Sequence, residues 1–189
     1  MLELNFSPFP IITTERLVLR QIINDDETEL FLLRSNPNIM RYIPRPLPKT
    51  IADLKPLLQS FDEGISKGES ISWGITLKSD NKFIGNIGFV RMSKENHRAE
   101  VGYLLNENYH GTGIMMEALK GVLRYGFEAL RLHSVEALVN SENIASRKLL
   151  EKTGFIQEAH FKENFFYNDQ FEDTVVYSLL GKNFNPDKN

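Results

Sequence analysis

The chain has 189 residues and a formal net charge of −3 at pH 7, with acidic and basic residues interspersed along it. Its length suits one ordinary domain, and the charge balance argues against binding to nucleic acid or to a membrane surface. It has no cysteine, which excludes disulfides, thiol nucleophiles and thiolate metal sites.

The two ends of the chain are expected to flank a single domain. Residues 1–12 form a lead that has no basic n-region and is interrupted by prolines, so it does not resemble a signal peptide. No apolar run approaches the roughly 20 residues of a membrane-spanning helix. We therefore expect a cytoplasmic protein with one domain over residues 13–181 and a C-terminal tail over residues 182–189.

The first third of the chain predicts one strand and two helices. Alternating aliphatic residues indicate a strand at 16–20, and an acidic start indicates a helix over about 26–34. A proline-dense loop with three cations follows at 41–49, which is either a stiff surface connection or a wall of an acceptor site. Apolar residues at helical spacing predict a second helix over 50–67, with Pro56 as a bend or a break.

The middle of the chain predicts an antiparallel meander followed by a long helix. Strands are indicated at 72–77, 83–89 and 98–105, the first two joined by a polar turn. An apolar stripe opposite charged residues predicts an amphipathic helix from about residue 114 to residue 130.

The last third predicts a crossover and a closing hairpin. It contains a strand at 134–139, a short helix at 144–152 ended by Gly154, and two late strands at 155–165 and 174–180. The element order favours an α+β, or mixed α/β, domain around one mostly antiparallel sheet of about seven strands, with helices on both faces.

Gly111 and Gly113 lie between the strand at 98–105 and the long helix. A strand that passes through a glycine turn into a helix start makes an anion site, because unpaired backbone N–H groups and the positive end of the helix dipole converge there. The turn lacks the third glycine of a dinucleotide fingerprint and the lysine of a Walker loop, which weakens both nucleotide interpretations. We predict a phosphate-bearing cofactor here.

Three motifs resemble those of the GCN5-related N-acetyltransferase (GNAT) superfamily. They are Glu100-Val101-Gly102-Tyr103-Leu104-Leu105, then Tyr109-His110-Gly111-Thr112-Gly113-Ile114-Met115-Met116-Glu117-Ala118, and Asn140-Ser141-Glu142-Asn143-Ile144-Ala145-Ser146 ahead of Leu149-Leu150-Glu151-Lys152-Thr153-Gly154-Phe155. Within the superfamily the chain is similar to ribosomal-protein N-terminal acetyltransferases of the RimJ/RimL kind, from Thr14-Glu15-Arg16-Leu17 to residues 173–180. Nearly the whole chain is covered.

The resemblance implies an acyl-CoA N-acyltransferase fold and acetyl-CoA as the cofactor. The strands at 100–105 and 134–139 would splay apart, the pantetheine arm would pair along the first of them, and the pyrophosphate would lie on the N–H groups of residues 111–116. The expected cofactor-binding residues are Leu104, Leu105, His110, Gly111, Thr112, Gly113, Ile114, Met115, Met116, Asn143 and Ser146.

The resemblance also implies direct attack of a primary amine on the thioester. Glu100, a charge inside an apolar strand, is our candidate base, with a structural ion pair to Arg91 or Arg98 as the alternative. Many relatives carry a tyrosine acid where this chain has Leu150, so Ser146, which occupies the place of the branch's serine, is the candidate donor to the leaving thiolate or a residue of the helix's first turn.

Four further residues carry narrower expectations. A backbone N–H near Leu104 would stabilise the oxyanion, and Asn143 is expected to cap the short helix and contact the pantetheine arm. His110 stands where the branch often has tryptophan, and is either a titrating group or a surface turn histidine. Asp173 matches a branch pattern without a physical role. No histidine forms a cluster with carboxylates at ligand spacing, so we predict no metal.

The expected acceptor is a protein N-terminal α-amine, as in ribosomal-protein-alanine acetylation. Such an amine has an unperturbed pKa of about 7.7–8.0, whereas that of a lysine lies near 10.4, so the α-amine needs only a modest base. A small amine such as a polyamine or an antibiotic, and a non-catalytic acyl-CoA-binding domain, are the alternatives. We expect a monomer or homodimer, with aromatic residues 161–167 in the core and a dimer surface or, less favoured, in an acceptor pocket.

Overall fold

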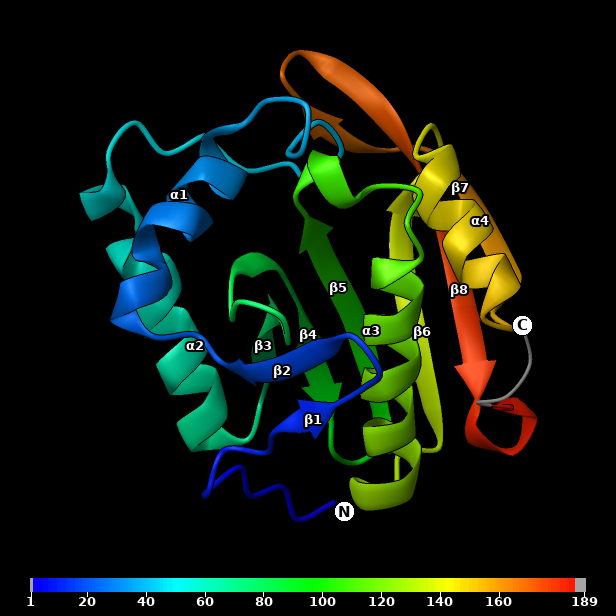
Figure 1. Ribbon diagram of the computed structural model, residues 1–189. Helices are drawn as coiled ribbons and strands as arrows, with labels where there is room; N and C mark the ends of the chain where they lie inside the picture. Colours follow the sequence, from blue (N-terminus) through cyan, green and yellow to red (C-terminus); the bar gives the residue numbers. More distant parts are fainter. Residues whose placement is uncertain (1, 186–189) are drawn as a thin grey trace.

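Figure 1 shows the computed structural model, which describes residues 2–185. The strands are β1 (Ile12–Thr13), β2 (Leu17–Gln21), β3 (Ile71–Leu77), β4 (Phe83–Ser93), β5 (Arg98–Leu105), β6 (Ser134–Asn140), β7 (Ile156–Tyr167) and β8 (Gln170–Leu180). The α-helices are α1 (Glu27–Ser35), α2 (Lys55–Lys67), α3 (Ile114–Arg124) and α4 (Ile144–Lys152). Every predicted strand and helix is present.

The strands form one sheet of eight, in the order β1-β2-β3-β4-β5-β6-β8-β7. All neighbours are antiparallel except β5 and β6, which are parallel and joined through α3. The mixed α/β fold with a mostly antiparallel sheet is confirmed. The prediction of about seven strands missed β1, since a strand of two residues carries no periodic signal.

Two predicted helices are interrupted. The segment predicted over 50–67 divides into a 3-10 turn, Ile51–Leu54, and α2, and Pro56 lies in the first turn of α2, where its missing N–H costs nothing. Pro56 therefore marks the start of a helix. The long helix predicted over 114–130 is interrupted too, because it changes at Tyr125 into a π-helical turn, Tyr125–Ala129.

Helices cover both faces of the sheet, as predicted. The larger core cluster lies beneath α3 and α4, and its Trp73 ring meets those of Phe89 and Tyr125 edge-on. A smaller cluster joins Phe83 to Leu30 of α1. Since Phe83 and Ile84 are adjacent in β4 and belong to different clusters, the two clusters lie on opposite faces of the sheet.

The chain ends pack on this core. Phe6 is buried, the Phe9 ring lies 6.0 Å from that of Trp73, and Trp73 Nε1 donates to Pro10 O at 2.7 Å. At the other end the Phe184 ring lies 5.2 Å from that of Phe127. The predicted tail also includes residues 186–189, which lie outside the described residues. Within residues 2–185, no helix is long and apolar enough to cross a membrane.

The outer half of the β7–β8 hairpin extends beyond the body of the domain (Figure 1). Four of its phenylalanines are 41–64% exposed: Phe161, Phe165, Phe166 and Phe171. The prediction that this segment joins the core is therefore wrong. Its dimer-surface and acceptor-pocket interpretations stay predictions.

Asp173 organises an irregularity in this hairpin. The β7 register shifts between Phe161 and Phe165, and within that shift Glu163 has a positive φ of 47°. Asp173 Oδ1 accepts the Glu163 N–H at 2.8 Å, and its Oδ2 lies 2.7 Å from His160 Nε2. The carboxylate thus holds the bulged backbone, which gives Asp173 the physical role that the sequence did not supply.

Candidate functional site

β5 and β6 diverge after a short paired stretch, and the word cleft denotes the region between their unpaired parts. The two strands pair at only three positions, Arg98–Glu100 against Ser134–Glu136, and beyond them each is supported on its outer side alone, β5 by β4 and β6 by β8. The splayed pair implied by the resemblance is therefore present. A bulge at Val90 of β4 lies beside the last paired position, and a bulge bends the strand that contains it.

The glycine turn connects the open end of β5 to α3. Gly111 and Gly113 have φ values of 73° and 81°, a left-handed backbone that favours glycine. The first hydrogen bond of α3 runs from Glu117 N to Gly113 O at 3.0 Å, so the helix leaves the N–H groups of the preceding residues without helical partners. Apart from Gly111 and its neighbours His110 and Thr112, no residue among 2–185 has an atom within 4 Å of a Cβ placed on Gly111. These donors and this open surface fit a diphosphate group.

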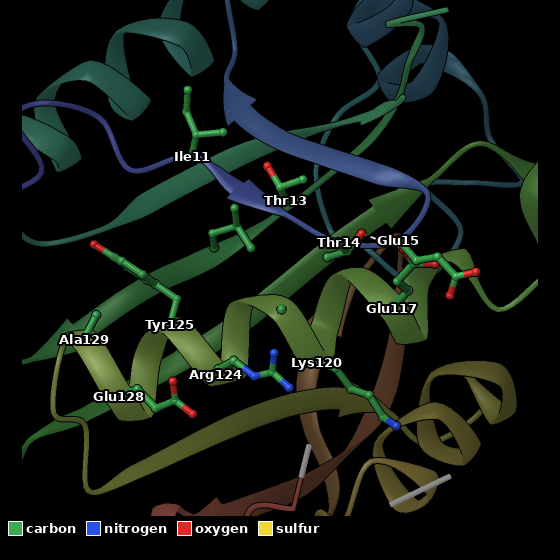
Figure 2. Close-up of a pocket in the computed structure, with 12 residues that line it drawn as sticks. Ile11, Thr13, Thr14, Glu15, Glu117, Lys120, Arg124, Tyr125, Glu128 and Ala129 are labelled. Carbon is green, nitrogen blue, oxygen red and sulfur yellow. Dashed lines mark hydrogen bonds between the residues drawn. The ribbon is translucent and has the colours of Figure 1, made fainter. Parts of the chain in front are cut away.

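The first turn of α3 is anchored to the N-terminal strands (Figure 2). Glu117 Oε1 accepts from Thr14 Oγ1 at 2.5 Å and from Arg16 N at 2.7 Å, while Glu117 Oε2 accepts from Arg16 Nε at 2.6 Å. Arg16 Nη1 also donates to Thr112 O, at 3.0 Å, within the glycine turn. Burial opposes ionisation of Glu117, but these hydrogen bonds outweigh it and lower its pKa.

Side chains of the turn bond within it. Thr112 Oγ1 donates to Tyr109 O at 2.7 Å, and His110 Nε2 lies 3.0 Å from Leu105 O. His110 therefore connects the turn to the end of β5, as a turn histidine does. The bonds of these two side chains go to backbone oxygens, and the phosphate role of the N–H groups in this turn stays a prediction.

Glu100 lies at the last paired position of β5, directly opposite Glu136 of β6. Its side chain is 15% exposed, and Arg91 Nη1 lies 3.5 Å from Oε2, outside hydrogen-bond geometry. Oε2 is buried and has no hydrogen-bond partner among the described residues. Burial raises the pKa of the Glu100 carboxyl, Arg91 opposes the rise and Glu136 adds to it. Of the two predicted ion pairs, only that with Arg91 forms, because Arg98 pairs with Glu136 at 2.5 Å.

Ser146 lies on the first turn of α4, facing β5. Asn143 caps the helix as predicted: its Oδ1 accepts the Ser146 N–H at 3.1 Å. Ser146 Oγ lies 2.6 Å from the hydroxyl of Tyr103 on β5, and Leu150, in the place of the usual tyrosine, is fully buried. Burial raises the pKa of Tyr103 to about 12, although its hydrogen bond with Ser146 opposes the rise.

The cleft separates two kinds of polar group. Successive β-strand side chains alternate between faces, so Glu100 and Tyr103 lie on opposite faces of the sheet, with Ser146 on the Tyr103 side. Leu104 and Leu105 follow on the open part of β5. The structure thus places a carboxylate on one side of the opening and a pair of hydroxyls on the other.

The sequence predictions did not identify Tyr103, Arg16 or Glu117 as site residues. A signal for Tyr103 existed, since it alternates with Val101 and Leu105 and so faces the side that α4 covers. Arg16 and Glu117 are 101 residues apart, and neither residue alone indicates the pair.

A second concavity runs along the outer side of α3 and is distinct from the cleft. It is a groove of about 620 Å³ between β1 and α3, lined among others by Glu117, Arg124 and Glu128 (Figure 2). None of the predicted site residues lines it. Separately, no three His, Asp or Glu side chains within the described part of the chain are grouped to hold a metal ion.

Comparison with known proteins places the chain among acetyltransferases. Residues 16–156 match the family described as "Acetyltransferase (GNAT) domain". YoaA of Bacillus subtilis, named as an uncharacterised N-acetyltransferase, is 34% identical over 172 residues, covering 91% of this chain and 97% of that protein. The ribosomal-protein-serine acetyltransferase of Escherichia coli is 30% identical over 101 residues, covering 53% of this chain and 56% of that protein.

Solved structures of acetyltransferases have the same fold. A GNAT-family acetyltransferase from Bacillus anthracis superposes with a TM-score of 0.81 at 26% identity, over 92% of this chain and 99% of that one. The spermidine N-acetyltransferase of Vibrio cholerae, solved with CoA and spermine, gives a TM-score of 0.79 at 24% identity, over 88% and 96% of the two chains. With its splayed strands and glycine turn, this chain belongs to the GNAT family of acetyl-CoA-dependent N-acetyltransferases.

Proposed function

We propose that this protein transfers the acetyl group of acetyl-CoA to a primary amine in a ternary complex, and that a protein N-terminal α-amine is its preferred acceptor. The observation that carries the proposal is the opening between β5 and β6, which has a glycine turn at one end and polar groups on both faces.

Acetyl-CoA would be held by backbone groups more than by side chains. The N–H groups of residues 111–116 would bind the pyrophosphate, and the exposed edge of β5 at Leu104 and Leu105 would pair with the pantetheine arm. The carbonyl oxygen of the Asn143 side chain is used in capping α4, which leaves its NH₂ group as a donor to the same arm.

The reaction divides between the two faces of the sheet. Glu100 accepts the amine's proton through water, and its burial keeps the carboxylate a better base than an exposed glutamate. The amine nitrogen bonds to the thioester carbon, a backbone N–H near Leu104 stabilises the oxyanion, and the C–S bond then breaks. Ser146, on the opposite face, donates a hydrogen bond to the leaving sulfur.

The acceptor class is argued from the acidity of the amine. A lysine or polyamine amine has a pKa near 10, whereas an α-amine has one of about 7.7–8.0, so the α-amine demands less of a carboxylate base such as Glu100, whose pKa burial raises. The ribosomal-protein-serine relative supports the same class. Two alternatives are tested alongside it: a small amine such as spermidine, and acyl-CoA binding without turnover.

The experiment follows thiol release from acetyl-CoA with a panel of acceptors. It includes peptides with free N-termini, the same peptides with blocked N-termini and an internal lysine, spermidine, and an aminoglycoside. We expect rapid release with free N-termini and little with the blocked peptides. Preference for spermidine or the aminoglycoside would overturn the acceptor assignment, and tight acetyl-CoA binding without release for any amine would overturn the enzyme activity.

A further inference from the structure

Among residues 2–185, the one side-chain hydrogen bond to the Ser146 hydroxyl comes from Tyr103. The two oxygens lie 2.6 Å apart, and Tyr103 reaches from β5 across the cleft side of the sheet to the first turn of α4. The Ser146 backbone N–H is bonded to Asn143, so the cap fixes the serine's backbone and leaves its hydroxyl to Tyr103. The direction of this hydrogen bond decides where the serine's proton points.

Only one direction leaves Ser146 able to assist the reaction. If Ser146 donated to Tyr103, its single proton would be occupied. If Tyr103 donates, the serine oxygen is satisfied as an acceptor and its own proton is free to point into the cleft. We propose that Tyr103 is a positioning residue, which donates its phenolic proton to Ser146 Oγ and thereby directs the Ser146 proton at the sulfur that leaves. This inference rests on the proposed function.

The pair acts by hydrogen bonding and does not transfer its protons. As the N–C bond forms and the C–S bond breaks, the sulfur takes the electron pair of the C–S bond, and a thiol of this kind ionises near pH 8.5. The pKa of Tyr103 is about 12, so transfer of its proton to the thiolate would be unfavourable by a factor on the order of a thousand. The amine's proton passes through water to Glu100, and the thiolate later takes a proton from water.

The test is a double-mutant cycle on turnover with the best acceptor of the panel. Tyr103→Phe and Ser146→Ala should each lower kcat about tenfold, the effect of one hydrogen bond to a developing charge, with the KM for acetyl-CoA within about twofold of wild type. The double variant should be no slower than Ser146→Ala, because Tyr103 acts through the serine.

Tyr177→Phe is the matched control. Tyr177 is buried on β8 and also bonds to α4 residues, Arg147 at 3.2 Å and Glu151 at 2.8 Å, whereas the hydroxyl of Ser146 bonds to Tyr103. The Tyr177→Phe variant should be less stable than wild type, but its kcat should not fall tenfold. Should Tyr103→Phe fail to fold in thermal denaturation, Tyr103→His serves in its place, since a ring N–H replaces the phenolic donor and should retain more turnover than Ser146→Ala.

A pH profile separates positioning from proton transfer. Because Tyr103 stays protonated below about pH 12, the ratio of Tyr103→Phe to wild-type kcat should be constant from about pH 6 to 9.5. Three results would each overturn the inference. The ratio of the two kcat values could vary with pH, or Tyr103→Phe could be as fast as wild type. Tyr103→Phe could also lower kcat by the same factor in the Ser146→Ala background as in wild type. The proposed function fails instead if wild-type protein releases no thiol with any acceptor.

Discussion

Replacing Gly111 with alanine should have a small effect on the stability of the protein and a larger effect on its affinity for CoA. The residue has a φ of 73°, and an L-residue in the left-handed region costs about 1–2 kcal/mol. Beyond its own chain neighbours, no described residue has an atom within 4 Å of the added Cβ, so no steric clash with the rest of the chain adds to that cost. We expect the unfolding free energy to fall by about 1 kcal/mol, which lowers Tm by about 2–4 °C in a chain of this length.

The effect on CoA should be larger. A methyl group on Gly111 would project from the surface where the N–H groups before α3 converge, and it would hold the pyrophosphate away from them. A hydrogen bond to a charged group is worth about 1.5–3 kcal/mol, so losing one weakens binding roughly 10- to 100-fold. Isothermal titration calorimetry with CoA measures this loss.

Gly154→Ala is the matched control for that substitution. Gly154 follows α4 with a φ of 93°, and its nearest neighbour to an added Cβ is Leu179 Cδ1 at 3.7 Å, so the backbone cost is similar. Its CoA affinity should equal that of wild type. If Gly111→Ala bound CoA as tightly as Gly154→Ala does, the pyrophosphate would not lie on this turn and the reasoning would be refuted.

Three carboxylate substitutions make further predictions. Glu100→Gln should lower kcat/KM most near pH 6.5, where the amine is protonated, and least near pH 9; an equal loss at both would exclude a base. Glu136→Gln removes the like charge that raises the pKa of Glu100, so the acid limb of the rate profile should move to lower pH; an unmoved limb would assign it to another group. Glu117→Gln should lower the free energy of unfolding by about 1–2 kcal/mol at pH 7. This figure is kept small because Arg16 is half-exposed and solvent screens its charge. Since the pKa of Glu117 is lowered by folding, urea unfolding should show this difference above about pH 4.5 and lose it as the pH falls further.

Local pattern was enough to predict most of the fold. Strands such as β3 and helices such as α3 carry long periodic signals, and the cap at Asn143 is a local signal too. The prediction that residues 161–167 lie in the core was wrong because aromatic content alone does not show whether a hairpin packs on the domain or extends from it. Cytoplasmic location and oligomeric state stay predictions.

The candidate site was predicted less completely, for a physical reason. Backbone donors at Gly111 and Gly113 are visible in a short motif, whereas the direction of a side chain such as Tyr103 depends on which helix covers its strand. The environment of Glu100 depends on Arg91 and Glu136, which come from different strands. Such contacts exist only in the assembled sheet.

The bonds from Thr14 and Arg16 to Glu117 have a consequence for modularity. Residues 98–155 contain every predicted cofactor contact, yet the turn among them is braced by a segment made more than 80 residues earlier. The glycine turn therefore depends on residues far outside its own motif. A fragment that begins after Arg16 would keep the whole motif and lose these hydrogen bonds, so the start of this chain is as much a part of the proposed acyl-donor site as the motif itself.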